Sequence, residues 1–200
     1  MLEPLPADDT VSTVDLDVPD CDLVLTLDAD SMLLPEYAVR LVHELGKPGN
    51  ERIGVIQTPY SAYHDVPTRL EMLAGATTDL QHIVHQGLTA FEATFWVGAN
   101  AIIRRQALED IRDEVVDDGI VHARFIRDNT VIEDTESSIE LIDRGWRLYN
   151  YPERLSYSMT PSDFGALVVQ RRRWANGGLL MLSSLRRYIG ARKRQGRPIS

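Results

Sequence analysis

The sequence predicts an α/β domain whose sheet is at least partly parallel. An apolar run from Leu23 to Leu27 precedes an amphipathic segment, and a second apolar run follows at Ile53 to Gln57. This strand–helix–strand order is the unit of a parallel sheet. The chain has 200 residues, of which 44% are hydrophobic and 26% charged, which suits a single globular domain with a substantial core.

The first helix is expected between the two strands. Pro35 suits the first position of a helix, and Gly46 suits its end. Between them an apolar stripe at helical spacing consists of Tyr37, Ala38, Leu41, Val42 and Leu45. The uninterrupted apolar character of residues 22–27 predicts a buried first strand.

A long helix is expected over Pro67 to Gly87, with four aliphatic side chains facing inward: Leu70, Leu73, Leu80 and Val84. His82 and His85 lack companion ligands for zinc, so we interpret them as residues on the helix surface. Gly98 breaks the apolar run from Phe95 to Ile103, which predicts a loop followed by a strand.

The second half of the chain shows weaker local signals. Residues 105–111 suit a short helix, whereas the charged and irregular stretch 113–129 predicts a flexible loop. Asp134 suits the N-cap of a helix that ends at Arg144 before Gly145, and residues 146–151 alternate like a strand.

The last helical region is predicted in two parts. Thr160 to Asp163 resembles a capping box with a proline at the first helical position. The helix that follows is expected to pass through Gln170 and Trp174 and to stop where Gly177-Gly178 interrupts it. Residues 179–188 suit a second, amphipathic helix.

The net charge of −9 conceals an uneven distribution. Residues 1–163 carry 12 basic and 30 acidic side chains, whereas residues 164–200 carry nine basic and no acidic ones. A basic end on an acidic body indicates an anionic partner, such as nucleic acid, anionic lipid or pyrophosphate. Nucleic acid fits poorly because the basic residues lack interleaved aromatic side chains.

Several compositional features exclude other classes. The single cysteine, Cys21, excludes an internal disulfide framework and fits a reducing compartment. No stretch approaches the roughly 18 apolar residues that would span a bilayer. Met1 to Asp20 lacks the apolar centre of a signal peptide, and we expect residues 1–21 to be a frayed lead-in. The glycine motifs of phosphate-binding loops and the serine motif of hydrolases are also absent.

Two aspartates follow the first strand. Ligands of open α/β sheets bind at the carboxyl ends of strands, and Asp28 and Asp30 could share a hard cation such as Mg²⁺ or Mn²⁺ there. An isolated Asp-x-Asp is more often an ordinary turn at a strand end.

Two further acids open the helix near residue 134. Asp134 could remove a proton from an acceptor hydroxyl, while an acid at a helix start is also an ordinary cap. Near the end of the chain Gln170, Arg173 and Trp174 share one helix face. An arginine suits phosphate oxygens and a tryptophan suits a sugar ring, although a basic stretch with a core tryptophan is the simpler interpretation.

Together these motifs resemble the inverting family-2 glycosyltransferases, specifically the membrane-embedded cellulose-synthase-like branch. The resemblance covers roughly residues 22–185 and is carried by four segments in the same order and spacing: Leu27-Asp28-Ala29-Asp30-Ser31, Phe95-Trp96-Val97-Gly98-Ala99-Asn100, Ile132-Glu133-Asp134-Thr135-Glu136 and Gln170-Arg171-Arg172-Arg173-Trp174. It implies a GT-A-like fold, a nucleotide-diphosphate sugar donor, a glycan acceptor and a divalent cation, Mg²⁺ or Mn²⁺.

The resemblance also implies roles for individual residues. Asp30, with Asp28 beside it, would hold the metal and the diphosphate, and Asp134 would be the catalytic base. Gln170 and Arg173 would contact the pyrophosphate. The acceptor site would include Trp174, Glu133 and the loop that contains Trp96 and Gly98.

The chain departs from the family pattern in three places. Ile132 stands where the family usually has threonine, no strands resembling the family's first nucleotide-binding strands precede residue 22, and no membrane helices follow Trp174. We therefore expect a partial GT-A domain over 22–185, part of a larger protein. A basic tail over 186–200 would lie beside the membrane, at the cytoplasmic face of a bacterial inner membrane.

Two other interpretations remain open at this point. The chain could be a non-catalytic module that binds a membrane surface or a protein and keeps the fold. It could also be a generic acidic α/β domain, in which case the three motifs would not converge in space.

Overall fold

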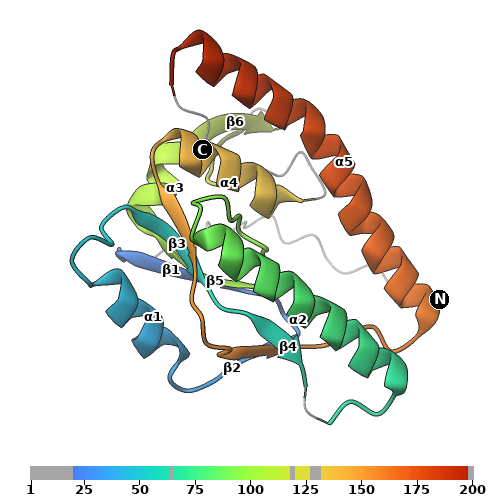
Figure 1. The fold of residues 1–200 in the computed structure, drawn as a ribbon. Coiled ribbons are helices and arrows are strands. Elements are labelled where there is room, and N and C mark those ends of the chain that lie inside the picture. Colours follow the sequence, from blue (N-terminus) through green and yellow to red (C-terminus); the bar gives the residue numbers. More distant parts are fainter. Residues whose placement is uncertain (1–19, 64, 118–119, 127–131, 198–200) are drawn as a thin grey trace, which may run out of the picture.

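The main sheet has four strands in the order β1 (Leu23–Leu27), β5 (Asn100–Arg104), β3 (Ile53–Gln57) and β8 (Arg147–Asn150). The structure is a computed structural model that describes residues 20–197 except 64, 118–119 and 127–131 (Figure 1). Nearly all of the expected lead-in, residues 1–19, lies outside the described residues. β3 and β8 are parallel, while β5 is antiparallel to both of its neighbours.

This arrangement corrects the expected strand–helix–strand unit. β1 and β3 run in the same direction, as predicted, but β5 is inserted between them and pairs with each. β1 lies at the edge of the sheet, and Leu25 and Leu27 remain 46% and 42% exposed. The prediction of a buried first strand was therefore wrong, because within the described residues β1 pairs on one side only.

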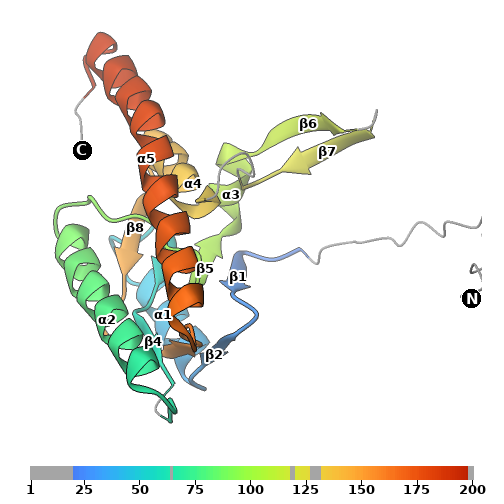
Figure 2. The ribbon, with the colours of Figure 1, turned by 90° about the vertical axis from the view of Figure 1, so that its right-hand side faces the viewer.

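The remaining strands form two smaller sheets. β2 (Ser31–Leu33), β9 (Ser156–Ser158) and β4 (Tyr60–Ala62) form one, in the order β2-β9-β4. β6 (Asp113–Asp117) and β7 (Ile120–Arg124) form an antiparallel hairpin that projects from the body (Figure 2). The predicted flexible loop over 113–129 was wrong for these strands, because Val116 pairs with Val121 across the hairpin and an ion pair between Arg124 and Asp113 joins its open end.

Three helices agree closely with the sequence. α1 (Tyr37–Leu45) buries Tyr37, Leu41 and Leu45 and ends at Gly46. α3 (Arg105–Ile111) has the predicted bounds. α4 (Glu133–Asp143) has Ile132 as its N-cap, two residues before Asp134, so the prediction of Asp134 as the cap was wrong.

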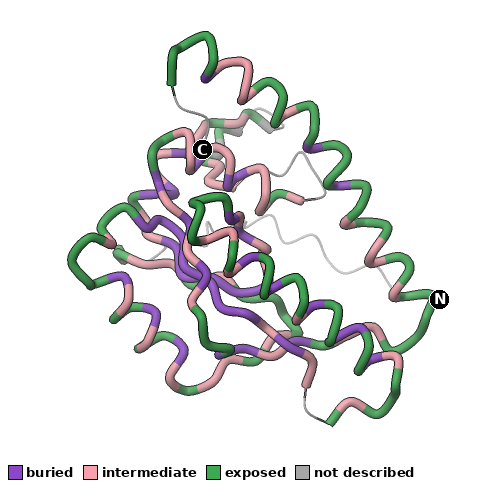
Figure 3. The backbone as a smooth tube through the Cα atoms, viewed as in Figure 1, coloured by how far each residue is buried: buried purple, intermediate pink, exposed green. Residues whose placement is uncertain are grey.

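Helix α2 (Arg69–Thr89) exists as predicted, but the face that it buries is opposite to the predicted one. Leu73, Leu80 and Val84 are 64%, 64% and 61% exposed, and His82 and His85 are buried, as the alternating colours along the helix in Figure 3 reflect. The reason is close packing against β4. A Cβ at Gly75 would lie 2.8 Å from the Cβ of Ala62, so the inner face accepts only small or polar side chains.

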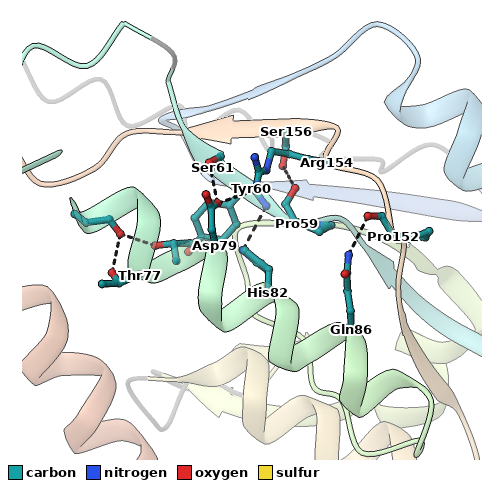
Figure 4. Close-up of polar contacts among 12 residues, drawn as sticks. Pro59, Tyr60, Ser61, Thr77, Asp79, His82, Gln86, Pro152, Arg154 and Ser156 are labelled. Atoms are coloured by element: carbon teal, nitrogen blue, oxygen red, sulfur yellow. Dashed lines mark hydrogen bonds and ion pairs between the residues drawn. The ribbon is translucent and has the colours of Figure 1, made fainter. Parts of the chain in front are cut away.

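Polar contacts hold this inner face in place (Figure 4). The backbone N–H of Tyr60 donates to Nε2 of His82 at 3.3 Å. Asp79 accepts from Ser61 at 2.9 Å and pairs with Arg154 at 2.8 Å. Since buried polar groups require partners, these contacts outweigh the burial of leucines in setting the orientation of α2.

Helix α5 (Phe164–Arg194) is continuous through Gly177 and Gly178, so the predicted interruption was wrong. Its N-cap is Asp163, whose side chain accepts from the N–H of Ala166, and the expected capping box at Thr160 does not form. The expected domain boundary at residue 185 falls inside this helix. Beyond it, Arg192 is buried, and Arg192 and Arg197 pair with Asp143 of α4.

Candidate active site

A cavity of about 570 Å³ lies among α2, α5, the N-terminus of α4 and the end of β1. Its lining includes eight of the nine residues that the sequence analysis assigned to a site: Asp28, Asp30, Gly98, Glu133, Asp134, Gln170, Arg173 and Trp174. The three motifs therefore converge in space, against the interpretation as a generic acidic domain.

The two aspartates line the cavity directly after β1, and both are exposed. The N–H of Asp28 donates to the carbonyl of Ala99 at 3.0 Å, and the Ser158 hydroxyl donates to Oδ1 of Asp30 at 3.1 Å. Burial raises the pKa of Asp28, as do the neighbouring carboxylates of Asp30 and Glu133, while Arg173 opposes them. Negative charge thus gathers at this edge and is only partly compensated.

The chemistry of these donors fits a hard divalent cation. Within the described residues no group of three or more acidic, histidine or cysteine side chains could hold a metal. Mg²⁺ commonly binds through one or two carboxylates and completes its shell with water and substrate phosphates, so the pair Asp28 and Asp30 suits such an ion.

Asp134 lies in the first turn of α4, lines the cavity and is half-buried. Its Oδ1 accepts from the N–H of Thr135 at 2.6 Å, and its Oδ2 faces Gly98. Gly98 has a φ of +82°, and a Cβ there would lie 2.8 Å from Oδ2, so only glycine fits. Burial raises the pKa of Asp134, although the hydrogen bonds from Thr135 counteract part of this effect.

The α5 side of the cavity contains two arginines with different surroundings. Arg171 lies 4.4 Å above the Trp174 ring, and its Nη2 donates to the Thr77 hydroxyl at 2.7 Å. Arg173 is exposed and makes no hydrogen bond or ion pair within the described residues. Arg171 therefore connects α5 to α2, whereas Arg173 is free to meet an anion.

Comparison with known proteins identifies the family. Residues 23–197 match the profile of Glycosyl transferase family group 2. The chain belongs to this glycosyltransferase family. Its mixed α/β architecture, with helices flanking the sheets, accordingly confirms the predicted GT-A-like fold class.

Similar proteins are cellulose synthase catalytic subunits. The chain is 28% identical over 164 residues to a UDP-forming cellulose synthase catalytic subunit of Dictyostelium discoideum, covering 82% of this chain and 14% of that protein. It is 26% identical over 161 residues to the UDP-forming cellulose synthase catalytic subunit of Komagataeibacter sucrofermentans, covering 78% and 19%. The chain thus spans less than a fifth of either relative. Over the part of the chain that the structure describes, no helix is both long and apolar enough to cross a membrane.

The α2 wall of this glycosyltransferase cavity was not predicted. His82, His85 and Tyr60 line it, together with Phe95. The His82 ring lies 4.8 Å from the ring of Tyr60, and the His85 ring lies 4.3 Å from that of Phe95. Burial lowers the pKa of His82 to about 4 and also lowers that of His85, so the wall is uncharged at neutral pH.

A sequence signal for this wall exists. Small and polar residues recur at helical spacing through Glu71, Ala74, Thr78, His82 and His85, which marks the face that packs closely. The larger leucines on the opposite face concealed it.

Trp96 is the one assigned residue that does not line the cavity. Its side chain packs in the core with Ile103 and Trp146, and its backbone N–H donates to the Ser138 hydroxyl at 2.9 Å. The adjacent Phe95 and Val97 line the cavity instead.

Proposed function

We propose that this site performs a metal-dependent, inverting transfer of a sugar from a nucleotide-diphosphate donor, a UDP-sugar, to a glycan acceptor. The observation that supports the proposal is the convergence of Asp28 and Asp30, Asp134, and the Arg173–Trp174 face in one cavity. The relatives named as UDP-forming cellulose synthase subunits support the choice of donor and of polysaccharide as the acceptor class.

Asp134 acts as the base in this proposal. It accepts the proton of the acceptor hydroxyl as that oxygen attacks the sugar carbon from the face opposite the diphosphate, in a single displacement. Burial makes the carboxylate a better proton acceptor by raising its pKa, and the Thr135 hydrogen bonds hold its orientation.

The donor diphosphate is held from two sides. Arg173 and Gln170 approach it from α5, and the carboxylates of Asp28 and Asp30 face it from the end of β1. A divalent cation bound to these carboxylates would supply charge compensation for the leaving diphosphate. Arg173, which has no hydrogen-bond or ion-pair partner among the residues that the structure describes, adds a donor for the diphosphate.

The acceptor lies against Trp174, with Gly98 beneath it and Glu133 beside it. A tryptophan face suits the C–H groups of a sugar ring, and the uncharged α2 wall suits a neutral sugar better than an acidic one. Trp96 supports this loop from the core, and Phe95 takes its place in the wall.

The test combines binding and turnover. Titration of UDP with Mn²⁺ should show cation-dependent binding that Asp30→Ala abolishes and Asp134→Asn retains. Release of UDP from UDP-sugars in the presence of oligosaccharide acceptors should fall about 10²- to 10⁴-fold in Asp134→Asn. Glu109→Gln on α3, outside the cavity lining, is the control. Full turnover by Asp134→Asn would refute the assignment, and binding without turnover in the wild type would favour a non-catalytic module.

The surface of α5 supports an association with the cytoplasmic face of a membrane. Leu179, Leu180, Leu182 and Leu185 are exposed on this helix, together with Arg186 and Arg187. A basic amphipathic surface binds anionic lipids with about 1 kcal/mol for each basic residue near the bilayer. Co-sedimentation with anionic vesicles should weaken in Arg186→Glu/Arg187→Glu and with added salt, but not in Arg112→Glu. Equal sedimentation of all three proteins would exclude this contact.

A further inference from the structure

Gln57, the last residue of β3, makes hydrogen bonds that the reaction scheme does not use. The residue is 3% exposed, and its side chain reaches the loop that carries Gly98. Nε2 donates to the carbonyl of Phe95 at 2.8 Å, and Oε1 accepts from the N–H of Val97 at 3.0 Å. One amide side chain therefore binds two backbone groups of the loop, as a donor to one and as an acceptor from the other.

Asn150 at the end of β8 determines which way this amide points. Its Nδ2 donates to the carbonyl of His85 at 2.9 Å, and a carbonyl accepts only, so the opposite atom of the Asn150 side chain must be oxygen. That Oδ1 accepts the second hydrogen of Gln57 Nε2 at 2.5 Å. The Oε1 of Gln57 is thereby left for Val97, so the oxygen and nitrogen of the Gln57 amide are assigned by their partners.

The loop has a second support on its other side. The hydroxyl of Ser138 accepts the N–H of Trp96 at 2.9 Å and donates to the carbonyl of Asp134 at 2.8 Å. The backbone from Phe95 to Val97 is thus hydrogen-bonded to β3 on one side and to α4 on the other. Gly98 follows immediately, at the position where any side chain would collide with Oδ2 of Asp134.

We infer that Gln57 is a positioning residue for the acceptor site. Its amide fixes the distance between the Phe95–Gly98 loop and the carboxylate of Asp134. This distance determines where an acceptor sugar binds relative to that carboxylate. The kinetic effect that we expect rests on the proposed function, whereas the effect on the loop's structure can be measured without turnover. The donor side, formed by Asp28, Asp30 and Arg173, receives no hydrogen bond from Gln57.

Gln57→Glu is the sharpest test because it exchanges a donor for an acceptor at unchanged size. The ionised carboxylate of this variant would still serve Val97 but would face the oxygens of Phe95 and Asn150 without a hydrogen to offer. We expect kcat/KM for the acceptor to fall about 10²-fold, as for other displacements of a supporting group, with the KM of the donor unchanged. Lowering the pH protonates the carboxyl and restores one donor, so the ratio of variant to wild-type activity should rise.

Two further variants distinguish loss of the positioning hydrogen bonds from a general loss of protein stability. Gln57→Met has similar length but no hydrogen bond to offer, so its deficit should persist at every pH. It also carries the test if Gln57→Glu fails to fold. Tyr37→Phe removes a hydrogen bond of similar burial, from Tyr37 to Asn100, on the α1 side of the sheet, and should match the wild type.

A structural measurement keeps this inference distinguishable from the proposed function. In protein labelled with 5-fluorotryptophan, ¹⁹F NMR separates Trp96 in the loop, Trp146 in the core and Trp174 on α5. Gln57→Glu should shift or broaden the Trp96 resonance, leave that of Trp146 unchanged and reverse the change at lower pH. If the wild type shows no turnover, the proposed function fails, and this spectrum still decides the role of Gln57. An unchanged Trp96 resonance, a raised donor KM, or equal and pH-independent deficits in both variants would overturn the inference.

Discussion

Replacing Gly177 by alanine places a methyl group in space that Ile132 occupies. The added Cβ would lie 2.4 Å from Cγ2 of Ile132 and 3.1 Å from its Cγ1, whereas carbon atoms in contact are about 3.5–4.0 Å apart. The neighbouring Gly178 lies in the same helix, and a Cβ there meets nothing within 4 Å. The two glycines therefore form a matched pair that differs in one contact.

The expected magnitudes follow from this difference. Both substitutions gain helix propensity of about 0.8–1.0 kcal/mol in a helix interior. Gly178→Ala should therefore be stabilising by about that amount. Gly177→Ala carries the same gain together with an overpacking cost of about 1–3 kcal/mol, so it should lie about 1–3 kcal/mol below Gly178→Ala in free energy of unfolding.

Urea unfolding followed by circular dichroism measures both values, and a double-mutant cycle identifies the contact. Adding Ile132→Ala to Gly177→Ala should recover most of the loss, because the colliding side chain is gone. The same substitution in the Gly178→Ala background should recover nothing. Equal stability of the two alanine variants would show that α5 does not cross the start of α4 at Gly177, and with it the placement of Asp134 opposite α5 would fail.

Three other predictions follow from single contacts. Both Gly75→Ala and Gly87→Ala gain up to about 1 kcal/mol of helix propensity, but the Cβ at position 75 would meet Ala62 at 2.8 Å and the one at position 87 meets nothing within 4 Å, so Gly75→Ala should lie about 1–3 kcal/mol below Gly87→Ala in free energy of unfolding. Equal melting temperatures of the two variants would contradict the packing of α2 on β4. The folded state holds the pKa of His82 at about 4 against 6.5 in the unfolded chain, so protons bind the unfolded state first and stability should fall as the pH drops from 6.5 to 4, by at most about 3 kcal/mol. His82→Gln keeps the acceptor for Tyr60 and should remove this part of the pH dependence of urea midpoints; identical slopes would refute it. Gly98→Ala should lower the proposed turnover about 10²-fold by displacing Asp134, and an unchanged kcat would contradict that contact.

Local signals in the sequence were sufficient for elements whose boundaries depend on their own residues. Gly46 ends α1 where expected, and the stripe of Tyr37, Leu41 and Leu45 faces the core. The four motifs that carry the family resemblance could also be read from the sequence, because each is a run of consecutive residues, and the roles of their residues stay predictions.

Other features depended on segments far apart in the sequence. The insertion of β5 between β1 and β3, and the placement of Trp96 in the core, require pairings that no local pattern specifies. The same holds for Gln57, whose partners lie 38 to 93 residues away. A polar residue at a strand end reads as an ordinary turn until its hydrogen-bond partners are known.

Residue types and their order were enough to predict an α/β framework and, through the motifs that resemble family-2 glycosyltransferases, the family itself, because apolar runs and short motifs are local information. Tertiary packing was needed to settle which way α2 faces and that α5 passes unbroken through two glycines. In both places the deciding contact is a backbone approach too close for a larger side chain, at Gly75 against Ala62 and at Gly177 against Ile132. Sequence periodicity predicts that the most hydrophobic face of a helix is buried. Where two backbones pack closely, the buried face instead needs small side chains and hydrogen-bond partners for its polar groups, and in this structure these needs decided the outcome.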